Sequence, residues 1–307
     1  MKIYQSIDEY ARQGYRSDVA LGYFDGVHEG HRAVIRLCTG QDDGAVKVVL
    51  TFRDSPAAAL GREAPPYLTD NEEKALLMWE LGIEAVIFAD FETIRELSAG
   101  TFVTQVLKEK LRARTVACGY NYRFGRGGAG DTAALTALCA GEGIAVFVAD
   151  PVTAAGETVS STRIRELLSE GEIPRANTML GHPYTVGGTV ERGNSLGSAM
   201  GYPTVNIPMD KGRAIPRYGV YASRITIAGE RFRGATNIGV HPSVGENDRP
   251  LCESFLIGYG GGALYGAAVI CEPVRFLRPE RRFSSLEALQ AQIERDVEEV
   301  RCSLGAE

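Results

Sequence analysis

The sequence predicts two domains: an α/β domain built on a parallel sheet, then a small antiparallel β-barrel that ends in a helix. In the first part, continuous apolar segments of strand length alternate with helical patterns, as in parallel sheets covered on both faces. After about Gly181, glycine-punctuated extended segments follow one another without a helical period, which indicates an antiparallel sheet or barrel. The 307 residues are enough for two such cores.

The strands expected in the first part are short and apolar. They are "DVALGYF", "VKVVLTF", "EAVIFA", "TVACG" and "IAVFVA". Helical patterns lie between them, in "GHRAVIRLC", "FVTQVLKEKL" and "DTAALTALCA". A further helix is predicted in "TDNEEKALLMWELG", with a capping box formed by Thr69 and Glu72 and an end at Gly82.

The second part is expected to pair its extended segments into the barrel. These are "YTVGGTV", "GVYASRITIAG", "ERFRGATNIG", "LCESFLIG" and "LYGAAVICEPVRF". The final helix is predicted to begin with a capping box of Ser284 and Glu287. Its apolar face is predicted to hold Leu286, Leu289, Ile293, Val297 and Val300. Because "STRIRELLSEGEIPRANTMLG" reads as a helical connection, we place the domains at 1–181 and 182–307.

Composition excludes several classes of protein. The net charge of −6 argues against a nucleic-acid partner, because phosphate-backbone binding needs positive charge. No apolar run approaches the roughly 18 residues that span a bilayer, so no membrane partner is expected. The six cysteines are scattered without CxxC spacing, which favours buried thiols over disulfides or zinc. We therefore expect a cytoplasmic protein.

The stretch "LGYFDGVHEGHRAVI" combines a strand, a glycine-rich turn and a helix start. Such a turn suits phosphate, since backbone amides and the helix N-terminus point at the anion and glycine permits close approach. His28 and His31 lie within it and would add two hydrogen-bond donors for charge that develops on phosphorus. Two other interpretations stay open on this motif alone: a metal site, for which HxxH supplies only two ligands, and a merely structural turn.

A second motif, "SSTRIR", favours the phosphate interpretation. Together with "GYFDGVHEGH" it resembles the paired signature of the HxGH nucleotidyltransferase superfamily. The motifs "YLTDNEEKALLMWELGIE", "GYNYRFGRGGAGD", "SSTRIRELLSEGEIPRA", "LGHPYTVGGTV", "GYPTVN" and "ESFLI" extend the likeness over nearly the whole chain. In this order they resemble the bacterial bifunctional riboflavin kinase/FMN adenylyltransferases, or FAD synthetases. The resemblance implies a Rossmann-like nucleotidyltransferase domain and a flavokinase barrel.

In the first domain the resemblance implies an ATP site. The turn positions that match are Gly22, Phe24, Asp25, Gly26, His28, Gly30 and His31. The matching helix positions are Ser160, Ser161, Thr162 and Arg165, which in the family hold ATP phosphates. In "GYNYRFG", Asn121 is expected to be a polar contact to nucleotide or flavin. Tyr122 and Phe124 are either stacking groups or simple core.

In the second domain the resemblance implies a kinase site. Thr204 and Asn206 in "GYPTVN" would hold Mg²⁺ and ATP phosphates, because Mg²⁺ prefers hard oxygen ligands. Gly193, Gly201 and Pro203 are further expected binding positions. Glu253 in "LCESFLI" matches the catalytic carboxylate, which takes the proton of the ribityl hydroxyl.

The resemblance implies phosphorylation of riboflavin to FMN and adenylylation of FMN to FAD, with ATP, Mg²⁺ and flavins as ligands and pyrophosphate as a product. The chain is expected to be a monomer or a weak homo-oligomer. The kinase loop "GNSLGSAMG" departs from the family in having Ser198 where an arginine is usual. An adenylyltransferase with an impaired kinase domain is therefore a second interpretation. A non-catalytic flavin-binding regulator is a third, less favoured because binding alone needs no donors such as His28 and His31.

Overall fold

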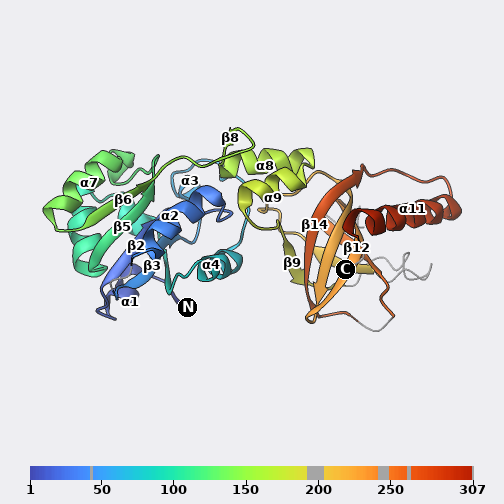
Figure 1. The fold of residues 1–307 in the computed structure, drawn as a ribbon, viewed down its shortest axis with the longest axis horizontal. Helices are drawn as coiled ribbons and strands as arrows, with labels where there is room; N and C mark the ends of the chain where they lie inside the picture. Colours follow the sequence, from blue (N-terminus) through green and yellow to red (C-terminus); the bar gives the residue numbers. More distant parts are fainter. Residues whose placement is uncertain (42–43, 192–203, 241–248, 261–263, 306–307) are drawn as a thin grey trace. The chain divides into compact units, whose positions relative to one another are not determined.

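The computed structural model describes residues 1–41, 44–191, 204–240, 249–260 and 264–305. Its backbone divides into two compact units, Met1–Ser161 and Thr162–Glu307, which are described separately. Figure 1 shows the elements of each unit along the chain. The two helices of the predicted connection, α8 (Ser161–Glu170) and α9 (Ile173–Leu180), lie almost wholly within the second unit. The structure thus divides between residues 161 and 162, and the domain boundary expected between residues 181 and 182 stays a prediction.

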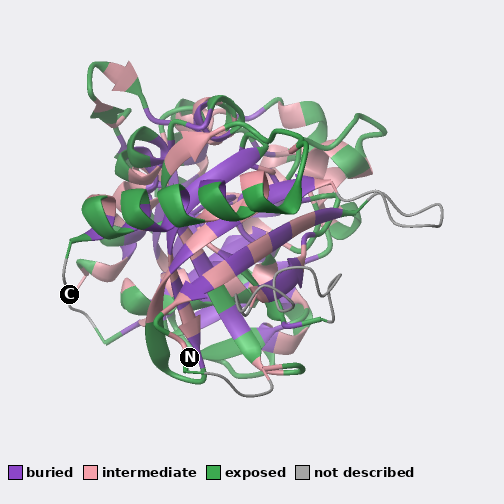
Figure 2. Ribbon diagram, turned by 90° about the vertical axis from the view of Figure 1, so that its right-hand side faces the viewer, coloured by how far each residue is buried: buried purple, intermediate pink, exposed green. Residues whose placement is uncertain are grey.

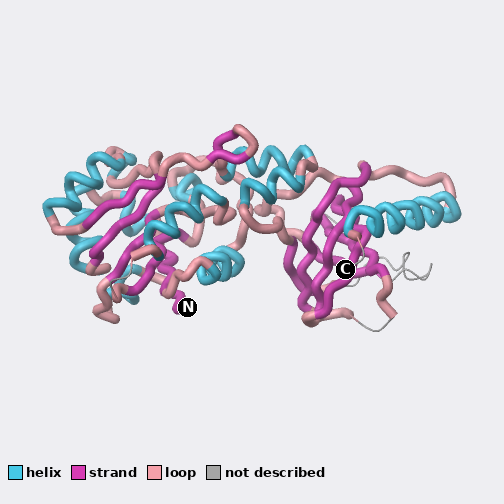
Figure 3. Tube along the Cα trace, in the orientation of Figure 1, coloured by secondary structure: helices cyan, strands magenta, loops and turns pink. Residues whose placement is uncertain are grey.

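The first unit is built on a six-stranded parallel sheet with the order β1-β4-β3-β2-β5-β6. Its strands are β1 (Lys2–Tyr4), β2 (Ser17–Leu21), β3 (Val46–Phe52), β4 (Ala85–Ala89), β5 (Ala113–Gly119) and β6 (Ala145–Ala149). The five longer strands confirm the prediction. β1 was not predicted, because three residues are too few for a periodic signal. Figure 3 shows the strands in magenta between cyan helices.

Helices cover both faces of this sheet, as buried, non-alternating strands require. The main ones are α1 (Ile7–Ala11), α2 (Glu29–Thr39), α4 (Asn71–Glu80), the π-helical η1 (Phe102–Lys110) and α7 (Thr132–Gly141). One apolar cluster joins the sheet to α1, η1 and α7, and the other joins it to α2 and α4. Figure 2 colours the chain by burial and is seen from the side of the second unit, whose last helix, Leu286–Leu304, presents an exposed face to the viewer.

Short elements complete the unit. They are α3 (Pro56–Ala59), α5 (Glu92–Arg95), α6 (Ala99–Thr101), η2 (Arg126–Gly128) and a hairpin of β7 (Thr153–Ala154) with β8 (Glu157–Thr158).

The second unit holds a six-stranded antiparallel sheet with the order β10-β13-β12-β11-β14-β9. Its strands are β9 (Val186–Thr189), β10 (Thr204–Pro208), β11 (Gly219–Ile227), β12 (Glu230–Val240), β13 (Pro250–Ile257) and β14 (Ala268–Arg278). A bridge between Glu191 and Asn206 joins the two edges, so the sheet is a nearly closed barrel. At this seam a Cβ on Gly188 would lie 2.7 Å from the Ile207 side chain, which explains the glycine.

The interior of the barrel mixes apolar and small polar side chains. On β13, Cys252 and Ser254 are buried while Glu253 between them is only partly buried, as alternation along a strand requires. The Ser254 hydroxyl shares a hydrogen bond of 2.9 Å with that of Thr236. All six cysteines are free thiols, five of them buried and Cys302 exposed.

The chain closes with α11 (Leu286–Leu304), which packs on β11 and β12. The predicted cap and part of the predicted face are wrong. Ser285 caps the helix, not Ser284, and Leu286 is 59% exposed. Asp296 is instead buried and accepts two hydrogen bonds from Arg278, at 2.9 and 2.7 Å, because the helix rests on the end of β14. Within the described ranges, the structure has no helix whose length and apolarity would let it span a bilayer.

Candidate active sites

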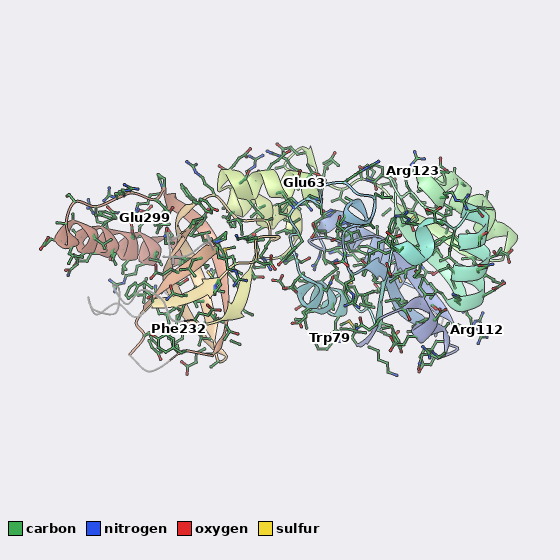
Figure 4. The ribbon with its side chains drawn as sticks, turned by 180° about the vertical axis from the view of Figure 1, so that it is seen from behind. Glu63, Trp79, Arg112, Arg123, Phe232 and Glu299 are labelled. Carbon is green, nitrogen blue, oxygen red and sulfur yellow. The ribbon has the colours of Figure 1, made fainter. Side chains whose placement is uncertain are left out.

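The turn that carries the two histidines follows β2, where the order of the strands along the sheet reverses. β2 is followed by β3 on one side, whereas its other neighbour is β5. In parallel sheets, ligands bind at such switch points, outside the carboxyl ends of the strands. Arg112 precedes β5 and Arg123 follows it, and Figure 4 labels them at opposite ends of this unit. The candidate site lies at the end to which Arg123 belongs.

The turn after β2 has an unusual backbone. Phe24, Gly26 and Val27 have φ of 57°, 83° and 39°. Side chains with a Cβ rarely adopt such values, which cost about 1–3 kcal/mol and concentrate at functional sites. A Cβ on Gly22 would lie 3.0 Å from the Phe24 ring, so glycine lets that ring fold back beneath the turn.

Residues just before α4 hold this turn in place. Asp25 Oδ1 accepts hydrogen bonds from the backbone amides of Leu68, at 2.8 Å, and Thr69, at 3.4 Å. The amide of Gly26 donates in turn to Thr69 Oγ1 at 3.0 Å. The predicted capping box of Thr69 and Glu72 is therefore wrong: the Thr69 hydroxyl serves the turn, and Asp70 and Glu73 form the capping box.

His28 and His31 lie together at the start of α2. His28 is the N-cap, and its Nδ1 accepts a hydrogen bond from the His31 amide at 3.3 Å. A neutral His28 ring therefore carries its proton on Nε2. The two rings stack, with centroids 3.5 Å apart and planes 15° from parallel. A Cβ on Gly30 would lie 3.1 Å from the His28 ring, so glycine makes room for the stack.

The His31 ring carries a nitrogen whose hydrogen-bonding capacity is not used. Its Nδ1 is buried and has no hydrogen-bond partner in the described part of the chain. Burial, together with repulsion by His28 and Lys74, holds the pKa of His31 well below its usual value. At neutral pH the ring is therefore an uncharged hydrogen-bonding group rather than a cation. An unpartnered buried nitrogen of this kind is costly unless a ligand completes it.

The serine motif reaches the same turn. Ser161, the first residue of α8, donates from its hydroxyl to the carbonyl of Asp25 at 2.9 Å. Ser160 precedes it, and Thr162 and Arg165 follow on the helix within the second unit. The structure thus joins Ser161 to the turn, and the ligand contacts of the other three stay predictions.

The segment after β5 divides between surface and core. Asn121 is exposed just beyond the carboxyl end of β5, the neighbour of β2. Phe124 is buried in the apolar cluster, 5.6 Å from the Phe102 ring, and Tyr122 stacks beside it at 6.0 Å. Of the two interpretations of these aromatics, the structure supports core packing.

Sequence reasoning missed Lys74 on α4. Its side chain is only 1% exposed, with Nζ 4.4 Å from the centroid of the Tyr23 ring in the turn. Burial lowers the pKa of Lys74 to about 8, although Asp25 and Asp70 oppose this shift. A signal was present: Lys74 and Met78 are four residues apart, and Met78 belongs to the buried face of α4.

In the second unit the predicted residues meet across neighbouring strands. Asn206 on β10 is paired directly with Glu253 on β13, which is paired with Asn237 on β12. Directly paired residues project to one face of a sheet, and Thr204, two residues before Asn206, shares that face. Asn206 is 5% exposed, and its Oδ1 is buried with no hydrogen-bond partner among the described residues.

Two further polar residues extend this row and were not predicted. Asn237 donates from Nδ2 to Glu280 Oε1 at 2.9 Å. A Cβ on Gly239 would lie 2.1 Å from Glu280 Oε1, so a glycine there admits the carboxylate. The predicted binding positions Gly193, Gly201 and Pro203, and the variant position Ser198, lie outside the described residues.

Comparison with solved structures shows that the fold is shared along the whole chain. A crystal structure titled macrolide-efflux protein, from Streptococcus pneumoniae, matches with a TM-score of 0.87. It is 25% identical in sequence, and the match covers 98% of this chain and 99% of that one.

Sequence comparison gives family matches in both parts of the chain. Residues 11–163 match the FAD synthetase family and residues 180–304 match the riboflavin kinase family. The bifunctional riboflavin kinase/FMN adenylyltransferase of Listeria monocytogenes is 36% identical over 92% of this chain and 91% of its own. The protein of the same name from Bacillus subtilis is 32% identical over 92% and 91%, and that from Escherichia coli K12 is 33% identical over 91% and 90%. The chain belongs to the family of bifunctional riboflavin kinase/FMN adenylyltransferases.

Proposed function

We propose that this protein makes FAD from riboflavin in two steps, one in each domain. In the second domain, riboflavin and ATP give FMN and ADP. In the first domain, a phosphate oxygen of FMN attacks the α-phosphorus of ATP, and pyrophosphate leaves. The observation that carries the proposal is the coexistence of matches to both families with two separate polar sites.

For adenylyl transfer, we assign the turn after β2 to the ATP phosphates. Its amides and the N-terminus of α2 offer donors to an anion. His28 and His31 would stabilise charge on the phosphorus under attack, acting as hydrogen-bond donors fixed before the reaction. Ser160, Ser161, Thr162 and Arg165 would bind the departing pyrophosphate, and Asn121 would contact nucleotide or flavin.

For phosphoryl transfer, we assign proton removal to Glu253. Its carboxylate would take the proton from the ribityl 5′-hydroxyl as that oxygen attacks the γ-phosphorus of ATP. The pairing of Glu253 with Asn206 supports this assignment, because it fixes the carboxylate beside the proposed phosphate ligands.

Mg²⁺ is the metal that the second site fits. The buried Asn206 Oδ1 has no hydrogen-bond partner among the described residues, as expected of an oxygen that awaits a cation. The Thr204 hydroxyl on the same face adds a second hard oxygen ligand, which suits Mg²⁺. When bound, the ion would neutralise phosphate charge.

One incubation tests the whole proposal. Purified protein, riboflavin, ATP and Mg²⁺ should yield FMN first and FAD later, as resolved by chromatography of the flavins. Conversion of supplied FMN to FAD, with riboflavin left unchanged, would instead support the second candidate, an impaired kinase, which Ser198 favours.

The six free thiols support the proposed cytoplasmic location.

A further inference from the structure

A buried lysine lies beneath the turn assigned to ATP, within the motif "YLTDNEEKALLMWELGIE" but so far without a role. We propose that Lys74 supplies a positive charge that holds the ATP polyphosphate at the turn after β2. This inference rests on the proposed adenylyl transfer and adds a binding residue to that site. The side chain of Lys74 is only 1% exposed.

Lysines are almost never buried without a partner of opposite charge. In the described part of the chain, the Lys74 ammonium forms no ion pair, and its close contact is the face of the Tyr23 ring at 4.4 Å. The face of an aromatic ring attracts a cation but does not neutralise its charge. The protein therefore keeps a desolvated charge at this position, which Asp25 and Asp70 offset only in part.

The groups around Lys74 come from three elements. The turn contributes Tyr23 and Asp25, and the start of its own helix contributes Asp70. The start of α2 contributes His31, whose pKa is lowered partly by Lys74, and His28 stacks on His31. One oxygen of Asp25, Oδ1, is already committed to the two amides before α4.

The other features of the turn also favour an anion. The N-terminus of α2 carries partial positive charge, and the buried Nδ1 of His31 lacks a hydrogen-bond partner among the described residues. Together with the ammonium of Lys74, these groups offer positive charge and hydrogen-bonding capacity to an anion. A polyphosphate would satisfy all three at once.

If Lys74 had a purely structural role, stability and phosphate binding would respond differently to its replacement. Such a lysine would stabilise the empty protein, and its replacement would weaken folding without changing how the protein responds to phosphate. A phosphate-binding lysine destabilises the empty site, because burial opposes its charge and lowers its pKa to about 8. A bound polyanion would reverse that shift, so phosphate binding should be coupled to protonation of Lys74.

Steady-state kinetics of FAD formation from FMN test the proposal with three variants. Lys74→Met removes the charge at similar length, Lys74→Arg keeps it, and Lys108→Met removes an exposed lysine on η1 as a control. We expect Lys74→Met to raise the KM for ATP about tenfold to a hundredfold, the effect of one lost charged contact. Lys74→Arg should restore most of the affinity, and Lys108→Met should match the wild type.

Calorimetry with tripolyphosphate gives a readout that needs no turnover. At pH 8, in two buffers of different ionisation enthalpy, the wild type should take up about half a proton more per bound tripolyphosphate than Lys74→Arg does. The difference isolates Lys74, because protons exchanged by the ligand are common to both proteins. Equal proton uptake would overturn the proposal.

The outcomes separate this inference from the proposed function. If the wild type makes no FAD from FMN, the proposed function fails, and calorimetry still decides the role of Lys74. If the wild type makes FAD and Lys74→Met keeps its KM for ATP, the inference alone fails. If Lys74→Met does not fold, the comparison of the wild type with Lys74→Arg decides. The riboflavin kinase step should be unchanged in all three variants.

Discussion

Asn206 and Glu253 are direct partners in the antiparallel pairing of β10 with β13. Their relative position is fixed by backbone hydrogen bonds of two strands rather than by a loop. The row continues through Asn237 on β12 to the carboxylate of Glu280. Replacing one side chain of this row therefore leaves the backbone register of the others in place.

Replacing Glu253 with glutamine should stop the kinase reaction. Glutamine keeps the size of the side chain but cannot accept the ribityl proton, and loss of a general base costs about 10²- to 10⁴-fold in rate. Glu253→Gln should therefore fail to make FMN from riboflavin, yet should make FAD normally from supplied FMN. Chromatography of the flavins measures both. Loss of both activities in a protein with an unchanged circular dichroism spectrum would contradict separate sites.

Replacing Asn206 with alanine should weaken the response to Mg²⁺. The variant loses the buried oxygen assigned to the metal, and we expect the Mg²⁺ concentration for half-maximal kinase rate to rise about tenfold or more. Asn237→Ala is the matched control, because the Asn237 amide already donates to Glu280. A shift of equal size in both variants would count against a metal ligand at Asn206.

Variants of the two histidines should distinguish capping of α2 from catalysis. His31→Ala removes a neutral donor, and loss of one preorganised donor costs about 10²- to 10³-fold in rate, so FAD formation should fall by that factor. His28→Asn keeps an N-cap of α2, since asparagine caps helices well, but removes the imidazole. It should fold like the wild type and still form FAD slowly.

In both histidine variants, riboflavin should still become FMN, which would accumulate in the assay. A histidine variant that keeps full FAD synthesis would remove that residue from the proposed chemistry.

The stability of the first domain should depend on Lys74 and on pH. Because the pKa of Lys74 falls from 10.5 to about 8 in the folded state, the unfolded state binds more protons between these values. The free energy of unfolding of the wild type should therefore rise with pH across this window. Below pH 8 the buried charge costs about 3 kcal/mol, at about 1.4 kcal/mol for each pKa unit.

Lys74→Met removes this cost, so it should be more stable than the wild type at pH 7, with the difference shrinking toward pH 10. Urea unfolding followed by the fluorescence of Trp79, the single tryptophan, measures this, because Trp79 lies exposed on α4 in the same domain (Figure 4). A less stable Lys74→Met at pH 7 would indicate a structural lysine.

Much of the fold could be predicted because its elements carry clear periods. "VKVVLTF" became β3 at Val46–Phe52, and the helix in "GHRAVIRLC" became α2. Both predicted N-caps were displaced by one residue, since Thr69 and Asp70, like Ser284 and Ser285, are adjacent residues that can each cap. A contact distant in sequence, from the Gly26 amide to Thr69, decided the first of these.

The candidate sites were predictable where residues lie within one motif. His28 and His31 are three positions apart, so their meeting follows from a single turn. Lys74 was missed because its burial depends on how α4 rests against the turn, which local sequence does not specify. Asn237 and Glu280 were missed because only strand register brings them to the row of Glu253.

The alternation along β13 also limits how this gene could change. Deleting one codon before Glu253 would shift the strand by one residue against both neighbours and turn every side chain to the opposite face. The carboxylate would then enter the barrel, and the thiol of Cys252 and the hydroxyl of Ser254 would leave it. Related sequences should therefore have no insertions or deletions within this strand. Differences in length should occur instead at the turn of Ala228 and Gly229 between β11 and β12.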